Sequence, residues 1–457
     1  MRWLSTRVTP AVRACATAED GGAMTRSPAT AIRSAEDLLA YVPHGLGHWP
    51  RESLVILADS GGEAGGLLRL DLPHRCTATL GTEIARYVGS VLAPGTPSGV
   101  FVIVYTAQRP RPGAGLPVLV HRLVRTLERL ELTVRDCLYV TDGGWGHIDR
   151  AGADAPWGRR RPLDDIAASV LNTEFVFAGR SWGSAPTDEV VAAATGPDAD
   201  EIRRWATVHD PGGRPDPPDA DWVRRIGEVW DEALATTEVA AEIHEGADER
   251  GERGAGEVAG GSAGGEGRAV PCPVSAETAG LLLAGLRSRT VRDLLLFQSA
   301  VGPSPVIPEL LLGDGRVRAG ARAHPGAERT AEACEREATD RDTCLRTGGM
   351  PLLASVITGT VALTPDWARL DTAHRVLEAL APHAQGEARC ATLTLLGWIE
   401  FARGRGSRAH RCLDAALKVD GRYELARLFD RFLDLGQVHE WARHRTTAWR
   451  SGHPDAA

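Results

Sequence analysis

The stretch Val100-Phe101-Val102-Ile103-Val104-Tyr105 decides the fold of the first half of the chain. Its β-branched and aromatic residues are typical of a buried strand. Pro117–Leu130 then repeats apolar side chains at helical spacing, and Val134–Thr141 is another strand-like run. Strand, helix and strand in this order predict a βαβ unit with a parallel strand pair and a right-handed crossover.

The segments around this unit extend the same pattern. Leu54–Ala58 and Leu67–Leu72 are apolar strands joined by a glycine-rich turn, which predicts an antiparallel hairpin. Thr77–Leu92 has the spacing of an amphipathic helix. Asp142-Gly143-Gly144 indicates a second hairpin, into Trp145–Ile148. We therefore expect an α/β domain with a small, mainly parallel sheet and flanking helices.

A helix and a loop precede the first hairpin. Ser34–Ala40 has a serine N-cap and an acidic residue three positions later, as capped helices do. Pro43 and the glycines near it predict a loop that continues to Pro50. His44 and His48 then lie in a loop with no third ligand at a suitable spacing, so we expect no metal site.

The rest of the chain is expected to be mostly helical. Helices are predicted at Leu163–Asn172, Thr187–Ala194, Asp198–Thr207, Asp219–Ile243, Ser275–Arg287 and Val291–Ala300. Residues 245–270 are rich in Gly, Ala and Glu and cannot bury a core, which predicts a flexible linker. The predicted boundaries are an N-terminal disordered extension at 1–33, an α/β domain with trailing helices at 34–244, a helical segment at 271–300, an irregular loop at 301–342, an all-helical C-terminal domain at 343–450 and a disordered tail at 451–457.

One part of the C-terminal domain has the spacing of a known repeat. Within Leu393–Asp420, small and apolar residues fall at the positions of a tetratricopeptide unit. Such arrays normally need about three copies for stability, and only one unit is present. A simple helical hairpin and a true repeat array therefore both remain open.

Composition excludes several classes of protein. The chain has 457 residues and a formal net charge of −8, which argues against bulk electrostatic binding of nucleic acid. No apolar run is long enough to cross a membrane, and no apolar core follows the N-terminal arginines as in a secretory signal. Translation from Met24 instead of Met1 is an alternative for this terminus.

The usage of lysine and cysteine narrows the chemistry further. Lys418 is the only lysine, so neither a Walker A loop nor Schiff-base chemistry is expected. The eight cysteines are scattered without a Cys-x-x-Cys pair, which indicates reduced thiols in a cytoplasmic protein. We expect no cofactor.

Two groups of residues are candidates for chemistry. Asp71, Thr106 and Asp142 follow three strands that the βαβ pattern makes parallel, and ligands bind at that edge of open α/β sheets. Gly179-Arg180-Ser181-Trp182-Gly183 has the spelling of a nucleophile elbow, with Phe175–Ala178 as a possible strand before it. Gly183 and Pro186 interrupt any following helix, so we do not expect a serine nucleophile.

Several runs of the sequence, taken together, match the pattern of a known family. They are Leu38-Leu39-Ala40-Tyr41-Val42-Pro43, Leu46-Gly47-His48-Trp49-Pro50-Arg51-Glu52-Ser53-Leu54-Val55, Arg69-Leu70-Asp71-Leu72-Pro73, Phe175-Val176-Phe177-Ala178-Gly179-Arg180, Val291-Arg292-Asp293 and Leu425-Ala426-Arg427-Leu428. The pattern resembles an uncharacterised bacterial family, domain of unknown function 4192, which is common in high-GC Gram-positive bacteria. The resemblance extends from about residue 34 to residue 441 and brings no known reaction with it. A cysteine cluster of many members is missing from residues 146–162.

Several charged residues lie within the runs that carry the resemblance. Arg292 and Asp293 are interpreted as charges on a helix surface. Arg69 and Asp71 share one face of a strand, where they can pair with neighbours or hold a small anion. The candidate ligand-binding residues are Gly47, Ser53, Arg69, Asp71, Thr106 and Arg180.

Two functional hypotheses follow from these observations. The first is a non-enzymatic interaction or regulatory protein that binds a protein partner through its C-terminal helices, with a small-ligand pocket in the α/β domain. The alternative is a hydrolase or nucleotide-related enzyme acting on an anionic small molecule. Neither hypothesis involves nucleic acid or a membrane as a partner.

Overall fold

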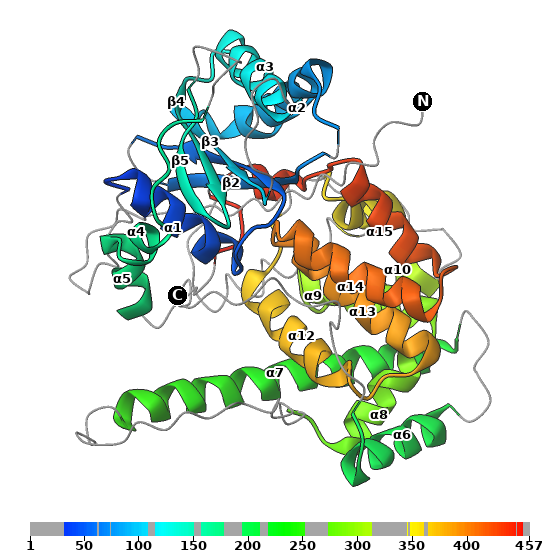
Figure 1. The fold of residues 1–457 in the computed structure, drawn as a ribbon. Helices are drawn as coiled ribbons and strands as arrows, with labels where there is room; N and C mark the ends of the chain where they lie inside the picture. Colours follow the sequence, from blue (N-terminus) through cyan, green and yellow to red (C-terminus); the bar gives the residue numbers. More distant parts are fainter. Residues whose placement is uncertain are drawn as a thin grey trace, which may run out of the picture. The chain divides into compact units, whose positions relative to one another are not determined.

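The computed structural model describes residues 32–61, 64–73, 75–107, 115–149, 157–177, 194–210, 218–251, 273–312, 345, 348–360, 364–444 and 446–450 (Figure 1). The chain divides into two compact units. The first takes residues up to 190 together with 400–411 and 428–456, and the second takes 191–399 and 412–427.

A five-stranded sheet forms the centre of the first unit. Its strands are β1 (Ser53–Asp59), β2 (Ala64–Asp71), β3 (Gly99–Tyr105), β4 (Val134–Thr141) and β5 (Gly144–His147), in the order β2-β1-β3-β4-β5. Only β3 and β4 pair in parallel, and the other three pairs are antiparallel. The sheet is therefore mixed, and the expectation of a mainly parallel sheet was wrong.

The position of β1 explains this difference. β1 lies between β2 and β3 and runs antiparallel to both, so β2, β3 and β4 all point in the same direction. The predicted crossovers through α2 (Ala78–Leu92) and α3 (Gly115–Arg129) are present, but the first passes over an intervening strand. All seven residues of β1 are buried, as a central strand requires.

Helices cover both faces of the sheet (Figure 1). α2 and α3 pack on one face, where their apolar side chains join those of β1 to β4 in a single core cluster. α1 (Ala35–Leu46), α4 (Asp164–Ala167) and α5 (Val170–Phe177) cover the other face in a second cluster. Truncation of a fully buried leucine in such a core typically costs about 2–5 kcal/mol.

α1 is longer than predicted. It continues through Pro43 to Leu46, because Val42, Pro43 and His44 are buried on the sheet side. Pro43 removes only one helical N–H, and the buried contacts offset that loss. Gly47 ends the helix at φ 78° and donates its N–H to the Pro43 carbonyl at 2.7 Å. The predicted loop therefore begins after Leu46.

The second unit is built from helices (Figure 1). α13, α14 and α15 each contribute residues to both units. The helices that follow the sheet domain are α6 (Pro197–His209), α7 (Ala220–Gly251), α8 (Ala276–Gly285), α9 (Arg289–Val301), α10 (Val306–Leu312), α12 (Trp367–Leu380), α13 (Gly386–Ala402), α14 (Gly406–Val419) and α15 (Glu424–Asp434). The first unit also has short 3-10 helices, at Ala93–Gly95 between α2 and β3 and at Glu440–Arg443.

Two of these helices enter stretches for which sequence predicted irregular structure. α7 runs past Ile243 to Gly251, into the start of the predicted linker. α10 lies within the predicted loop at 301–342, and Ser304 accepts the N–H of Val306 at 3.1 Å near its start. The remaining linker residues lie outside the described ranges, and the domain boundaries stay predictions.

Polar contacts join the buried faces of the second unit. Trp230 donates its indole N–H to the Ser299 hydroxyl at 3.1 Å. Arg369 pairs with Asp231 and also donates its Nε–H to the Gln298 carbonyl at 2.6 Å. These bonds hold α12 and α7 against α9.

Within the described residues, no helix is both long and apolar enough to cross a membrane.

Candidate functional site

Three of the strands end at the same edge of the sheet. β2 ends at Asp71, β3 ends one residue before Thr106, and β4 ends one residue before Asp142. Because these strands point in the same direction, the three residues lie along one edge, as the sequence predicted. β1 begins at this edge with Ser53, between Asp71 and Tyr105.

Arg69 is the centre of a hydrogen-bond network on one face of this edge. Its Nε–H donates to the Ser53 hydroxyl at 2.9 Å, and its Nη2 lies 2.6 Å from Asp71 Oδ1. Its Nη1 donates to the Ser407 hydroxyl at 2.9 Å. Ser53 is fully buried and donates its own hydroxyl to the Arg51 carbonyl at 2.6 Å. The structure thus brings together three of the candidate ligand-binding residues, Ser53, Arg69 and Asp71.

These bonds give Arg69 a positioning role. Only 12% of its side chain is exposed, and each of its three nitrogens already has a partner. Ser407 belongs to the first turn of α14, which Arg69 therefore holds against the ends of β1 and β2. Charge-assisted bonds of this kind contribute about 1.5–3 kcal/mol each.

Gly47 lies beside a second arginine. A Cβ atom at this position would lie 3.4 Å from Nη2 of Arg408, the residue after Ser407. Arg408 is half-buried, and its guanidinium forms no ion pair with any side chain in the described part of the chain. Its charge is therefore available beside the αL turn at Gly47.

His48 is buried, and the charges of these arginines affect its pKa. It is 6% exposed, and burial, followed by Arg69, Arg411 and Arg408, lowers its pKa to about 4. Its Nδ1 lies 3.2 Å from the Leu46 carbonyl. A carbonyl only accepts, so we assign the proton to Nδ1 and leave Nε2 as an acceptor. The imidazole is neutral at pH 7.

Thr106 belongs to a separate network. Its hydroxyl donates to Glu52 Oε2 at 3.0 Å, and the Ala107 N–H donates to Glu52 Oε1 at 2.7 Å. Glu52 has a φ of 39°. Burial, and to a smaller extent the negative charge of Glu52, raises the pKa of the Cys76 thiol to about 11. Thr106 thus shares the sheet edge with Asp71 but not its hydrogen bonds, and Arg180 lies outside the described residues.

The serine motif gains no support from the residues before it. Phe175, Val176 and Phe177 belong to α5, whereas a nucleophile elbow needs a strand there. The motif itself, Gly179 to Gly183, lies outside the described residues. His44, which the sequence placed in a loop, lies in α1, and its Nε2 is hydrogen-bonded to Asn172 Oδ1 at 2.9 Å.

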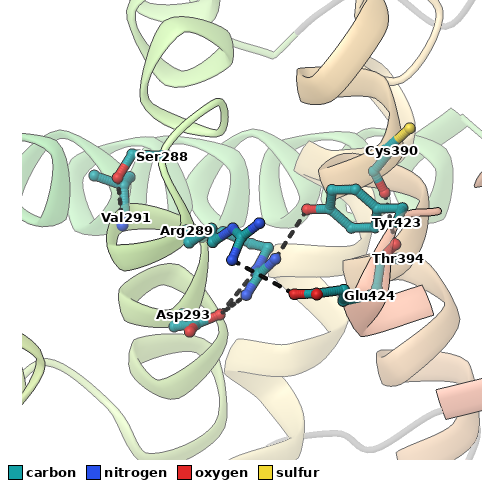
Figure 2. Close-up of polar contacts among 9 residues, drawn as sticks. Ser288, Arg289, Val291, Asp293, Cys390, Thr394, Tyr423 and Glu424 are labelled. Atoms are coloured by element: carbon teal, nitrogen blue, oxygen red, sulfur yellow. Dashed lines mark hydrogen bonds and ion pairs between the residues drawn. The ribbon is translucent and has the colours of Figure 1, made fainter. Parts of the chain in front are cut away.

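Arg292 and Asp293 form a second polar cluster, in the second unit. Arg292 Nη2 lies 2.7 Å from Asp293 Oδ1, and Nη1 donates to the Tyr423 hydroxyl at 3.0 Å (Figure 2). Beside them Arg289 pairs with Glu424 at 3.5 Å (Figure 2). Arg292 is only 8% exposed, so its interpretation as a surface charge was wrong.

The electrostatics of this cluster point to a structural role. Burial lowers the pKa of Arg292, but Asp293 and Tyr423 outweigh burial and raise it overall. Arg292 therefore stays charged and fixes α9 to the turn before α15. The N–H groups of Arg292 already bond Asp293 and the Tyr423 hydroxyl, so few donors are left to bind a ligand.

Other clusters within the described ranges offer less. No group of three or more His, Cys, Asp or Glu side chains there is arranged to hold a metal ion. A cavity at the opposite end of β1 has a mostly apolar lining that includes Ala58, Val91 and Leu92. The sheet edge with Arg69 and Arg408 is therefore the strongest candidate site.

Sequence reasoning missed the contribution of the C-terminal part of the chain to this site. Ser407, Arg408 and Arg411 follow Arg69 by more than 330 residues, and a single sequence carries no signal for such a contact. His48 was named only as a loop histidine. The two arginines at positions 408 and 411, three residues apart on a helix, were the only local sign of a charged face.

Comparison with known proteins places the chain in a family. No curated protein and no solved structure matches it. A family model described as a domain of unknown function (DUF4192) matches residues 36–335 and 314–438, and these ranges include both Arg69 and Arg408. Because the match spans most of the chain, the protein belongs to the DUF4192 family.

Proposed function

We propose that this protein binds a small anionic ligand at the carboxyl edge of its sheet, in a regulatory or interaction role. The observation that carries the proposal is the position of Arg408, which lies beside Gly47 and follows Ser407 of the Arg69 network, near a buried, neutral His48 whose pKa the neighbouring arginines lower. Such a grouping of like charges is costly unless an opposite charge joins it.

The charges around His48 support this reading. Asp71 pairs with Arg69, whereas Arg408 has no carboxylate partner in the described part of the chain. Only arginines are among the charged groups that act on His48. An anion beside Arg408 would compensate the positive charge of this guanidinium.

The expected affinity is modest. A hydrogen bond to a charged group contributes about 1.5–3 kcal/mol. Two such bonds, about 3–6 kcal/mol together, correspond to a Kd between several millimolar and tens of micromolar. This range suits a sensor of an abundant metabolite.

The enzymatic alternative has weaker support. A histidine whose pKa is about 4 is a poor general base at neutral pH. Ser53, the buried hydroxyl nearest in the network, already donates to the Arg51 carbonyl and accepts from Arg69. It is therefore held as a structural group rather than as a nucleophile.

Isothermal titration calorimetry with sodium sulfate tests the proposal. The Arg408→Gln variant should bind sulfate at least tenfold more weakly than the natural protein. Lys418→Gln is the matched control, because it removes one positive charge from an exposed position of the same helix. Equal sulfate affinity in the natural protein and Arg408→Gln contradicts the proposal.

The interaction role of the C-terminal helices remains part of this proposal. The tetratricopeptide-like segment Leu393–Asp420 spans α13 and α14, and Cys390 lies 3.6 Å from the Ala416 carbonyl. Ala409 and Ala416 are fully buried, as small residues are where paired helices approach. Retrieval of a specific protein partner from host lysate, lost in a variant with altered exposed residues of α14, tests this role.

The cytoplasmic location also stays a proposal. The cysteines Cys76, Cys137, Cys390 and Cys412 are reduced thiols, which is the usual state in the cytoplasm. Immunoblotting of fractions from its own host tests this point.

A further inference from the structure

We infer that the first unit has a second ligand site, a small cavity that binds an uncharged aliphatic compound with a carbonyl group, such as a short ketone, ester or amide. The cavity lies at the end of β1 opposite to the proposed anion site, and it does not depend on that site. The supporting features are the lining of the cavity, an unsatisfied donor in its wall and the charges beside that donor.

The lining of the cavity is mostly apolar. Ala58 at the end of β1 and Val91 and Leu92 at the end of α2 are buried and form part of the wall. Ala442 of the 3-10 helix Glu440–Arg443 adds a further buried apolar group. The cavity measures about 470 Å³ together with its open mouth, which is near the lower end of the range for small-molecule sites. A short aliphatic chain therefore suits this lining.

One hydrogen-bond donor in the wall lacks an acceptor. Arg443 lines the cavity, and its Nε is buried without a hydrogen-bond partner among the described residues. Glu440 Oε2 lies 3.8 Å from this nitrogen, which is too far for a hydrogen bond. A buried donor without an acceptor is unfavourable, so an oxygen atom of a ligand at this wall would stabilise the site.

The charge of this donor is already balanced. Glu440 lies 3.8 Å from Arg443 and 3.7 Å from His444, so one carboxylate is next to both basic side chains of the lining. An anionic ligand would be repelled by Glu440. Val91 and Leu92 are the last two residues of α2, where the helix dipole is negative, and this also disfavours an anion. A neutral carbonyl oxygen is therefore the acceptor that fits the arrangement.

Hydrogen bonds hold the wall that carries the donor. Trp441 of the 3-10 helix donates its indole N–H to the Ala402 carbonyl at 3.0 Å. Tyr87 of α2 donates its hydroxyl to the Gly436 carbonyl at 2.9 Å, which ties the preceding segment to α2. The wall is therefore formed before a ligand binds, and little conformational entropy is lost on binding.

Methyl NMR spectroscopy of the full-length natural protein tests the inference with three four-carbon compounds. Butanone is an uncharged carbonyl compound, butyrate is an anion and butylammonium is a cation. Butanone should shift the methyl resonances of Val91 and Leu92 in a saturable way. Its Kd should be at least about fivefold lower than the Kd of butyrate or butylammonium, because only butanone offers an acceptor without a charge.

Two outcomes of this titration overturn the inference. Binding of butyrate or butylammonium that is as tight as that of butanone excludes an uncharged carbonyl compound as the preferred ligand. Methyl resonances of Val91 and Leu92 that none of the three compounds shifts exclude the cavity as a site.

The variant Arg443→Met tests the donor itself. It keeps an aliphatic side chain in the wall but removes the Nε–H, so butanone should bind at least about fivefold more weakly. Arg86→Met is the matched control, because Arg86 is exposed on α2 and is not among the lining residues. Unchanged butanone affinity in Arg443→Met contradicts the inference. If this variant does not fold, the comparison of the three compounds on the natural protein decides.

Discussion

Arg69 donates a hydrogen bond of 2.9 Å to the hydroxyl of Ser407, although 338 residues separate them in the chain. The same guanidinium bonds Ser53 and Asp71, so one side chain joins two strands to the first turn of α14. Residues of the N-terminal strands are therefore hydrogen-bonded to a segment near the C-terminus, and the family model covers both segments. Arg408, the next residue, is placed beside Gly47 by this connection.

Loss of Arg69 should destabilise the first unit. We expect Arg69→Met to lower its free energy of unfolding by about 2–3 kcal/mol, because Asp71 and buried Ser53 lose a charged partner. Ser407→Ala should cost about 1 kcal/mol. In a double-mutant cycle measured by urea denaturation, the two changes should couple by about 1 kcal/mol. Additive effects mean that the hydrogen bond does not contribute in solution.

A comparison of two glycines separates backbone strain from a new methyl contact with Arg408. Gly47 and Gly61 have nearly the same φ, 78° and 76°, but a Cβ at Gly61 meets nothing within 4 Å. Each Gly→Ala change should cost about 1–2 kcal/mol in unfolding free energy. Only Gly47→Ala, whose methyl group would contact the Arg408 guanidinium, should also change sulfate binding in calorimetry. A change of similar size in Gly61→Ala contradicts the placement of Arg408.

The low pKa of His48 predicts a pH dependence of stability. Between about pH 6.5 and pH 4, the unfolded chain binds a proton at this histidine and the native chain does not. Stability therefore falls as pH decreases through this window, by up to about 3 kcal/mol from this group.

His48→Asn should remove that contribution, because its amide can still donate to the Leu46 carbonyl and does not titrate. Urea denaturation at pH 7 and pH 4.5 should then show a smaller loss of stability in the variant than in the natural protein. An equal loss in both proteins means that His48 is not buried among the arginines.

The Arg292 cluster predicts a stability effect without an effect on the ligand site. Arg292→Met should cost about 2–3 kcal/mol in the second unit, since Arg292 is buried and Asp293 loses its partner. Tyr423→Phe removes one hydrogen bond to the guanidinium and should cost about 1–2 kcal/mol. Sulfate binding should be unchanged in Tyr423→Phe; a loss of binding there places the ligand elsewhere.

Local sequence patterns predicted most of the elements of the sheet domain. β3, α3 and β4 form from runs whose apolar spacing is set within each segment, and the structure has them within two residues of the predicted bounds. The insertion of β1 between β2 and β3 was missed, because strand order depends on contacts between distant segments. The continuous apolar run at Leu54–Ala58 did carry a signal, since only a central strand is buried on both faces.

The candidate site was predictable only in part. The strand alternation predicted that Arg69 and Asp71 share one face of a strand, whereas the position of Ser53 opposite Asp71 was not predicted. The arginines of α14 could not be assigned to this edge, because their spacing alone also fits a solvated helix surface. The burial of Arg292 was not predicted for a similar reason, because an Arg-Asp pair on a helix is typical of an exposed helix surface.

The measurement that tests the anion site most directly is an anomalous-diffraction experiment on crystals grown with sodium selenate. We expect a selenium peak within about 4 Å of the guanidinium groups of both Arg408 and Arg411, at hydrogen-bond distance. Crystals of Arg408→Gln grown in the same solution should lack this peak. A natural protein without selenate at these arginines, or a variant that keeps the peak, contradicts the account.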